Sequence, residues 1–467
     1  MPSALRKAQL RALSLTRELA TTVKSKIFPD KTQSCLAFAE PSIVSKYDIS
    51  QPRRLRRAPI LTFEHVHFIH HLPIELLAHV FVLGSEDDVM FPVRISHVCH
   101  SWRQIALRTP RLWRRIALSS NIDMWKERIS RAGACTLDIQ LFPWRPTRWS
   151  ASERQYIDAM AIQWYLHPVM PLLRRWRSFE VVFKDYSPYL WNAALSGLCS
   201  RSRRSRAPTL QNLTLIYPVN DDTKEFCLFS GYAPNLRNVT LDGIRLTWLP
   251  SLFGNLVFLD YTHHGFSLGH QAVYDVVVML EISCRLVELR ILFPPRRRVV
   301  SHTRSSPVAR RVLLPSLQRL HLRVEGSDIP FELMHLMSLI LTPSLTSLSL
   351  IDVDHRRPTF PGLRSFFYIY AISPSIRLLR IEYRWYDPRM VSPIVSALPH
   401  LRRIVIRRPQ MSDQVLNLSS RNRKARWIRD FLQPVPSQID KVHTICEPTI
   451  GHSRYINHHI YVRPPVC

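Results

Sequence analysis

The pentapeptide GFSLG at residues 265–269 matches the G-x-S-x-G pattern, which places a nucleophilic serine on a tight turn between a strand and a helix. A strand-like run at 256–261 precedes it, and a helix-like run at 272–281 follows it. A serine hydrolase also needs an oxyanion hole, and a chain with only 11 glycines has no glycine-rich loop to form one. Because repeated strands and helices supply the same context, a serine hydrolase at Ser267 is a remote alternative.

Histidine and cysteine are the side chains that could hold a metal ion. The pairs His70-His71, His263-His264 and His458-His459 are adjacent residues, and adjacent side chains diverge on any regular element. The eight cysteines include no C-x-x-C pair and none at zinc-finger spacing from a histidine, which is ordinary usage for a reduced intracellular protein. We therefore expect no metal, no cofactor and no catalytic residue, and a protein that is not an enzyme.

The charge of the chain is strongly positive, with 64 Lys and Arg against 35 Asp and Glu and a formal net charge of +29. Such a surplus favours acidic partners, among them nucleic acids and acidic proteins. A basic protein that binds nucleic acid or acts as a scaffold is the alternative, and direct nucleic-acid binding is secondary because no known reading motif is visible. No apolar run approaches the ~18 residues of a membrane span, so we expect no membrane partner. A basic cluster within 53–57 is of nuclear-localisation type, and we expect the protein in the nucleus, the cytoplasm or both.

Eight short apolar segments recur after residue 205, most of them with the pattern Leu-x-x-Leu-x-Leu and a proline just before it. Their first apolar residues are Leu210, Leu236, Leu256, Leu286, Leu317, Leu345, Ile376 and Leu401, in steps of 20 to 31 residues. This period and pattern are typical of leucine-rich repeats. One strand cannot bury its apolar residues alone, but copies stacked in a parallel sheet can, with helices on the outer side. The Arg-rich stretches 201–206 and 294–313 are expected to be surface loops.

Residues 68–117 read as a compact set of three short helices. Pro73 suits the first turn of a helix that continues with Leu76, Leu77, Val80 and Phe81 at helical spacing. Residues 84–88 break this pattern. A second helix is predicted with Ile95, Val98, Cys99, Trp102 and Ile105 on one face, before Thr109-Pro110 ends it and Leu112-Trp113 begins the next segment.

The stretch 72–113 resembles an F-box. Four separated elements of that family's pattern occur in order: Leu72-Pro73-Ile74-Glu75-Leu76, Val80-Phe81, Val98-Cys99-His100-Ser101-Trp102 and Leu112-Trp113. One departure is a longer gap between Phe81 and Val98. The whole layout is similar to F-box-like families of mushroom-forming fungi, in which an N-terminal F-box precedes degenerate leucine-rich repeats.

The resemblance implies the substrate receptor of an SCF-type ubiquitin ligase. In such a receptor the F-box binds a Skp-type adaptor, and through it cullin and RING subunits, while the repeats hold an unknown protein target. The predicted adaptor-binding residues are Leu72, Pro73, Glu75, Leu76, Val80, Phe81, Val98, Cys99, Trp102, Leu112 and Trp113. These apolar anchors exceed what so small a helical unit can bury, although we expect Trp113 to pack in the core.

We therefore expect an α+β multidomain chain. An N-terminal helix and basic linker would occupy 1–58, a helical F-box domain 59–118, an irregular leucine-rich-repeat α/β solenoid 119–410, and a C-terminal cap or tail 411–467.

Overall fold

The computed structural model describes residues 69, 72–142, 158–199, 205–295, 310–354, 359–370, 373–407, 414–417 and 443–444. The predicted N-terminal helix, the basic linker and most of the tail lie outside the described residues. The chain divides into two compact units. Among the described residues, the first contains 69–116 and 124–135, and the second contains 117–123 and everything from 136 onward. Residues 124–135 thus pack with the first unit, beyond the predicted boundary at 118.

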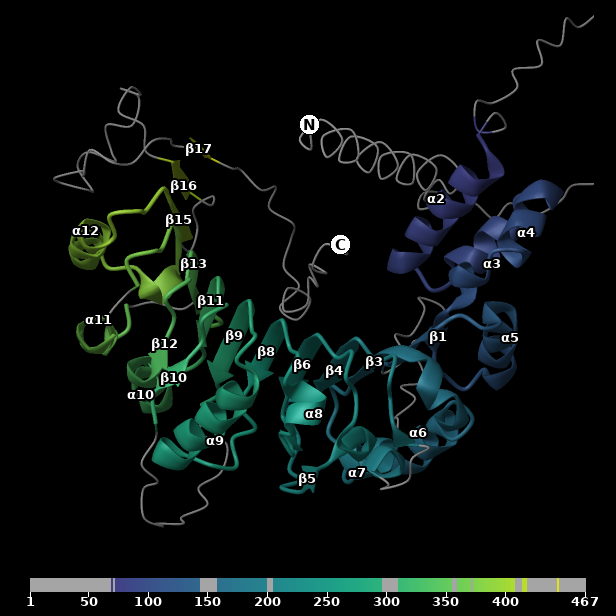
Figure 1. Cartoon of the computed structure of the whole chain (residues 1–467), viewed down its shortest axis with the longest axis horizontal. Helices are drawn as coiled ribbons and strands as arrows, with labels where there is room; N and C mark the ends of the chain where they lie inside the picture. The colour runs from purple at the N-terminus through teal and green to yellow at the C-terminus, as the bar shows by residue number, and fades with distance from the viewer. Residues whose placement is uncertain are drawn as a thin grey trace, which may run out of the picture. The chain divides into compact units, whose positions relative to one another are not determined.

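The first unit is helical (Figure 1). It contains α2 (Ile74–Asp87), α3 (Phe91–Ser96), α4 (His100–Leu107), a short 3₁₀ helix η2 (Pro110–Trp113) and most of α5 (Ile122–Ala132). Pro73 directly precedes α2, where its fixed φ suits entry into a helix. The buried face of α2 carries Leu77, Val80 and Phe81, and the Phe81 ring lies 4.9 Å from that of Trp102 on α4.

Two details of the predicted helices are wrong. α2 does not break at Gly84 but continues to Asp87. The glycine serves packing rather than a turn, because a Cβ at this position would lie 2.5 Å from the buried Phe91 ring. The single helix predicted from Ile95 to Ile105 is two helices. Cys99 between them has extended backbone angles (φ −157°, ψ 170°) and is the N-cap residue of α4.

The second unit is built on a parallel sheet, and β1 (Arg115–Ala117) lies where the two units divide. The strands from β2 to β15 follow one another in chain order, each parallel to the next. They are β2 (Leu137–Leu141), β3 (Trp176–Val182), β4 (Asn212–Ile216), β6 (Asn238–Asp242), β8 (Phe258–Thr262), β9 (Glu288–Phe293), β11 (Arg319–Val324), β13 (Ser347–Asp352), β14 (Leu378–Glu382) and β15 (Arg403–Arg407).

Shorter strands complete the β structure. β16 (Gln414–Asn417) pairs antiparallel with β15, and β17 (His443–Thr444) pairs antiparallel with β16. Two small pairs lie apart from this sheet, β5 (Glu225–Phe226) with β7 (Arg245–Leu246) and β10 (Val312–Leu313) with β12 (Ile340–Leu341). The stretch 294–313, expected to be a loop, therefore ends in a strand, while 296–309 lie outside the described residues.

Each of the eight predicted copies contributes one strand of the parallel sheet. The copies that begin at Leu210 and Leu236 form β4 and β6, and the last two form β14 and β15. In-register pairing places apolar residues of neighbouring copies side by side, as in Leu320 against Leu348. Mixed helices and parallel strands after a helical N-terminal unit confirm the α+β class.

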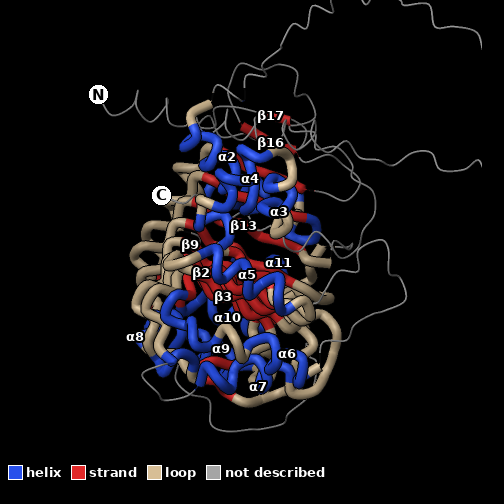
Figure 2. Tube along the Cα trace, turned by 90° about the vertical axis from the view of Figure 1, so that its right-hand side faces the viewer, coloured by secondary structure: helices blue, strands red, loops and turns tan. Residues whose placement is uncertain are grey.

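The helices of the second unit lie on one side of its sheet (Figures 1 and 2). They are α6 (Ala159–Leu166), α7 (Leu190–Leu195), α8 (Pro250–Phe253), α9 (Gly269–Ile282), α10 (Phe331–Leu339), α11 (Leu363–Ile369) and α12 (Pro388–Ala397), with 3₁₀ turns η3 (Met170–Arg175), η4 (Ser196–Cys199), η6 (Leu228–Gly231) and η7 (Tyr383–Trp385). Alternate strand residues, such as Leu320 and Leu322, are fully buried in the core of this unit. The residues between them point to the opposite face, which none of the described helices of this unit covers and which we call the open face.

Within the described part of the chain, the helices are too short or too polar to cross a membrane.

Candidate functional site

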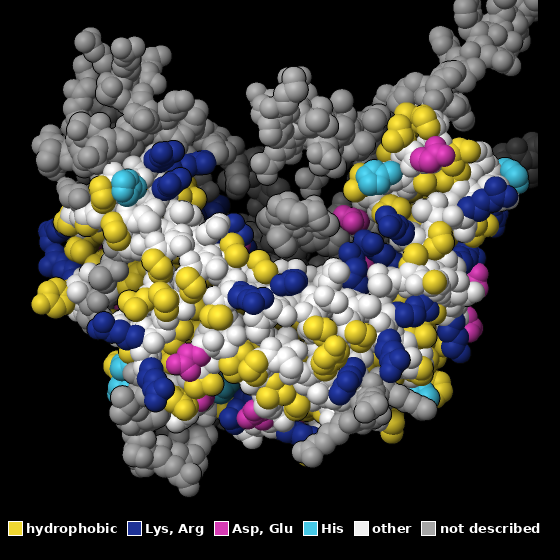
Figure 3. Space-filling view, in the orientation of Figure 1, with side chains coloured by type: hydrophobic (Ala, Val, Ile, Leu, Met, Phe, Trp, Pro, Cys, Tyr) yellow, Lys and Arg dark blue, Asp and Glu magenta, His cyan; other side chains and the backbone are white. Residues whose placement is uncertain are grey.

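The beginning of α2 presents apolar side chains to solvent. Ile74 is 64% exposed and Leu76 is 53% exposed, and Pro73 and Glu75 beside them are exposed as well. These residues lie at the N-terminal end of α2, before the buried residues Leu77, Val80 and Phe81. Figure 3 shows hydrophobic side chains gathered over α2. Exposed aliphatic residues grouped in this way are typical of a protein-binding surface.

Further exposed apolar residues of the same unit lie near the junction of α3 and α4 and at the end of α4. Val98 is 41% exposed, and Cys99 after it is exposed. Met90, which precedes α3, and Leu107, which ends α4, are exposed to a similar degree. Ile74, Met90 and Leu107 are not among the adaptor-binding residues predicted from the sequence. At helical spacing Ile74 shares a face with Leu77 and Phe81, three and seven residues later, so the pattern places it with the core and no signal in the sequence marks it as exposed.

Five of the predicted adaptor-binding residues are instead part of the core: Val80, Phe81, Trp102, Leu112 and Trp113. Trp113 is 1% exposed, and its indole N–H donates a hydrogen bond of 2.8 Å to the carbonyl of Ala106. A side chain with so little exposed surface holds the helices together and offers no area to a partner. The surface candidates are therefore Leu72, Pro73, Glu75, Leu76, Val98 and Cys99, of which Leu72 is half-buried.

Arginines position the C-terminal end of α2. Arg115 donates a hydrogen bond to the carbonyl of Glu86, and the buried Arg128 of α5 donates to the carbonyl of Val89. Carbonyls at a helix C-terminus carry partial negative charge, so guanidinium groups stabilise them. Burial, and then the charges of Arg131 and Arg115, lower the pKa of Arg128 to about 10, so it still carries its charge at neutral pH.

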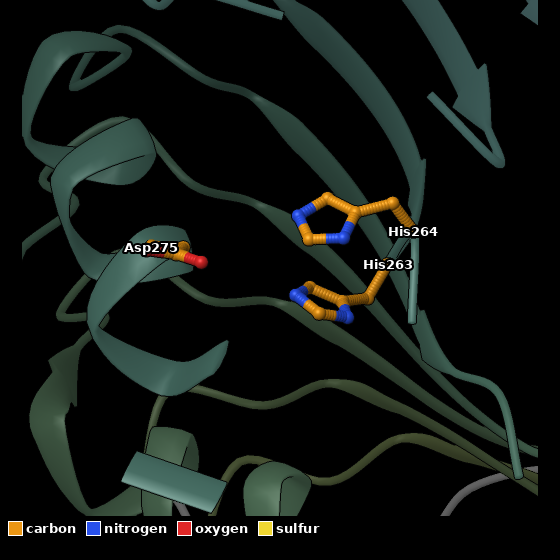
Figure 4. Close-up of side chains that lie close together, drawn as sticks. All are labelled: His263, His264 and Asp275. Atoms are coloured by element: carbon orange, nitrogen blue, oxygen red, sulfur yellow. The ribbon is translucent and has the colours of Figure 1, made fainter. Parts of the chain in front are cut away.

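The second unit contains a cluster of His263, His264 and Asp275 (Figure 4), and Ser267 is hydrogen-bonded to Asp275. The prediction that the two histidines diverge is wrong. Both follow Thr262, the last residue of β8, and the chain turns at Gly265 with a φ of 79°. Outside the regular strand the two rings point the same way, toward Asp275 on α9, and their centroids are 4.1 Å apart.

Backbone N–H groups determine where the imidazole hydrogens of this cluster lie. The N–H of Gly265 donates to Nδ1 of His263 at 3.2 Å, and the N–H of Phe266 donates to Nδ1 of His264 at 3.1 Å. Each Nδ1 is therefore unprotonated, and each neutral ring carries its hydrogen on Nε2. Burial lowers the pKa of His264 to about 3 and that of His263 well below its usual value, so both rings are neutral at physiological pH.

This arrangement differs from a catalytic relay of serine, histidine and aspartate. In such a relay the aspartate accepts the Nδ1 hydrogen of the histidine, and Nε2 receives the proton of the serine. Here Ser267 Oγ donates directly to Asp275 Oδ2 at 2.6 Å, and it lies 3.2 Å from the protonated Nε2 of His263. The histidine cannot accept the serine proton in this state, so the geometry does not activate Ser267.

The hydrogens on the two Nε2 atoms also argue against a bound metal ion. The nearest ligand atoms of His263, His264 and Asp275 lie within 4.8 Å of one another. However, a histidine that binds metal through Nε2 donates its Nδ1–H to another group, whereas both Nδ1 atoms here accept. The donor set does not fit a metal ion. The cluster is a hydrogen-bonded network that holds the turn between β8 and α9.

Comparison with known protein families gives a match for one part of the chain. A family model described as F-box-like matches residues 69–119, which span α2, α3, α4 and η2. No curated protein matches the chain. The matched residues include all the surface candidates on the first unit.

Proposed function

We propose that this chain, whose residues 69–119 form an F-box-like domain with a general adaptor role, is the substrate-recognition subunit of an SCF-type ubiquitin ligase. The domain binds a Skp-type adaptor and, through it, cullin and RING subunits. The second unit binds a protein target. The observation that carries this proposal is the pair of exposed aliphatic residues Ile74 and Leu76 at the start of α2.

The proposed function requires no catalytic group from this chain, so we propose that it is not an enzyme. A receptor that holds a target near the conjugating subunit raises the effective concentration of the target's lysines. The Ser267 cluster agrees with this role, since its hydrogen bonds lack the order of a catalytic relay. We propose that the protein acts in the nucleus, the cytoplasm or both, where such ligases find their targets.

The second unit is proposed to be an irregular leucine-rich-repeat solenoid. Its support is the in-register pairing of successive strands, each contributed by one copy of the apolar repeat. In such a stack each copy contacts only its neighbours, and one face of the sheet stays open along its length. That open face is where a target would bind.

Co-expression with a Skp-type adaptor, followed by affinity pull-down of the full chain, tests the proposal. The wild-type chain is expected to form a stoichiometric complex that survives ~0.3 M salt, where exposed charge pairs are screened. The double variant Ile74→Ala/Leu76→Ala is expected to lose the complex. Both side chains are largely exposed and alanine favours helix, so α2 should stay folded.

The matched control is Met160→Ala/Trp164→Ala on α6, which removes two apolar side chains, at least as exposed as Ile74 and Leu76, from the other unit. It is expected to retain the complex. Complex formation that survives the α2 variant, or is lost equally in both variants, contradicts adaptor binding through α2.

Nucleic-acid binding is the second candidate function, and the net charge of +29 favours it. A folded chain that fails to bind the adaptor but binds RNA or DNA would establish it. Affinity should then fall steeply with salt, because bound phosphates release counterions.

A further inference from the structure

The open face of β8 to β15 carries a group of charged side chains that we call the open-face cluster. Along these strands, residues at alternate positions share one face, and in-register pairing brings them into rows across the sheet. The cluster consists of Asp260, Glu288, Arg290, Arg319, His321, Arg323, Arg380, Glu382, Arg403 and Arg407. Six of these residues are arginines and three are carboxylates.

Each carboxylate of the cluster is shared between two arginines. Glu288 lies 2.6 Å from a nitrogen of Arg290 and 2.6 Å from a nitrogen of Arg319. Although burial works to raise the pKa of Glu288, the hydrogen bond from Arg319 and the charge of Arg290 hold it below its usual value.

The other two carboxylates are shared in the same way. Asp260 pairs with Arg323 and lies 4.0 Å from Arg290. Glu382 pairs with Arg380 and lies 4.0 Å from Arg407. Half of the guanidinium charge is therefore not neutralised within the cluster.

The arginines of the cluster lie outermost. The side chain of Arg319 is 47% exposed and that of Arg380 is 37% exposed, whereas the side chains of Glu288 and Glu382 are 10% and 3% exposed. A partner that approaches this face therefore meets guanidinium groups, with the carboxylates beneath them. Guanidinium groups bind carboxylates through paired hydrogen bonds and suit interfaces because they are weakly hydrated.

The earlier half of the same face has a different character. The alternate positions of β4 and β6 carry Asn212, Thr214, Asn238 and Thr240, with a hydrogen bond of 2.7 Å between the two asparagines. Arg177 on β3 is held by Asp138 of β2 at 2.7 Å. Within the cluster, β8 and β9 carry two carboxylates and one arginine, so the positive surplus begins at β11 and is a localised feature rather than a consequence of the basic composition.

We infer that the open-face cluster binds an acidic peptide segment, rich in Asp and Glu, that lies across β9 to β15. The inference rests on the proposed function in that this segment belongs to the protein target. The inner strands already pair with a neighbour on each side, so the peptide cannot add to the sheet and must be read by side chains. Strands about 4.8 Å apart give a width of about 19 Å, which about six extended residues span.

A single-stranded nucleic acid fits this face less well than a peptide. Proteins that bind single strands without sequence preference provide aromatic side chains on which bases stack. In the described strands β8 to β15, the alternate positions of the open face hold one aromatic side chain, Phe258 at the start of β8, and the guanidinium of Arg290 already lies over its ring at 5.0 Å. The cluster offers charge and hydrogen-bond donors, which a chain of carboxylates matches.

The test measures binding of a fluorescent twelve-residue peptide of alternating Glu and Ser to the full chain, by anisotropy at ~0.1 M salt. The same peptide with Gln in place of Glu is the ligand control, and it is expected not to bind. Arg319→Gln/Arg403→Gln removes two exposed charges of the cluster and is expected to weaken binding at least tenfold, since hydrogen bonds between charged groups are about twice as strong as neutral ones.

Arg364→Gln/Arg389→Gln is the protein control. It removes two exposed arginines from α11 and α12, so it changes the net charge equally and leaves the open face intact. Its affinity is expected to stay within about twofold of wild type. If both variants weaken peptide binding equally, the net charge of the protein explains the binding and the cluster does not. If an oligouridylate binds more tightly than the Glu peptide, the open face is a nucleic-acid site. Either result overturns the inference.

The adaptor pull-down on Arg319→Gln/Arg403→Gln separates this inference from the proposed function. The variant is expected to retain adaptor binding, because its substitutions lie outside the F-box-like domain. If the wild-type chain binds the adaptor but not the Glu peptide, the acidic-peptide site is refuted and the proposed function stands.

Discussion

Arg128 is a charged residue that belongs to the core of the first unit. It is 2% exposed, and its guanidinium donates to the carbonyls of Val89 and Arg115. A guanidinium can carry this role because it stays charged at neutral pH and presents donors in a fixed fork. No periodicity marks such a residue in the sequence, since an arginine on a short amphipathic helix is ordinarily placed on its solvated side.

Replacing Arg128 should therefore cost stability. Arg128→Ala leaves the Val89 carbonyl without its donor and opens a cavity, so we expect the free energy of unfolding to fall by about 2–4 kcal/mol. Urea denaturation of the full chain, followed by Trp fluorescence, measures this change. The exposed Arg103→Ala on α4 is the comparison and should change stability by less than about 0.5 kcal/mol. Equal effects of the two variants would show that Arg128 has no special role.

At the scale of the elements, the alternation of apolar residues predicted the strands correctly. The positions where helices end and where the chain turns after a strand were predicted wrongly. Each apolar copy became a strand because the requirement is local, with one buried residue at every second position. The predicted end of the first helix at Gly84 was wrong because glycine at this position makes room for the ring of Phe91. Phe91 belongs to another helix, so the local sequence around Gly84 does not show this packing requirement. The two histidines meet because the chain leaves β8 just before them, and no spacing rule encodes that turn.

The candidate surface was predictable to the extent that the F-box resemblance covers it. The pattern identified Pro73 and Leu76, which are exposed, but it also included Trp102 and Leu112, which are buried. A family pattern records every position that must be apolar and does not separate core from surface. Ile74, the most exposed aliphatic residue of α2, occupies a position that the pattern leaves open.

Substitution of Gly84 tests the packing of α2 against Phe91. Alanine at this position favours the helix by about 1 kcal/mol but places a methyl group against the Phe91 ring, and overpacking costs about 1–3 kcal/mol. We expect Gly84→Ala to lower the free energy of unfolding by about 1 kcal/mol in urea denaturation. Gly84→Ala/Phe91→Leu should lose less than the sum of the two single changes, because the smaller side chain makes room. Strict additivity would show that the two residues do not share this space.

At the scale of the whole molecule, buried neutral histidines make stability depend on pH. Burial lowers the pKa of His264 to about 3 and that of His263 well below its usual value. Burial also lowers the pKa of His321 to about 4, with Arg290 adding to this effect and Glu288 opposing it. In the unfolded chain each histidine titrates near 6.5. Below that pH the unfolded state binds more protons, so the folded state loses stability as the pH falls toward 4.

Each of these histidines contributes up to about 1.4 kcal/mol per pH unit between 6.5 and its folded pKa. Over the roughly 1.5 pH units from 6.5 to 5 the three histidines together give an upper limit of about 6 kcal/mol, so we expect the free energy of unfolding to fall by roughly 2–6 kcal/mol between pH 7 and pH 5, as measured by urea denaturation at each pH. His321→Gln should make this fall shallower, because glutamine binds no proton in either state. An unaltered slope in His321→Gln would mean that His321 is protonated in the folded chain, and that the surrounding arginines repel it less than the structure implies.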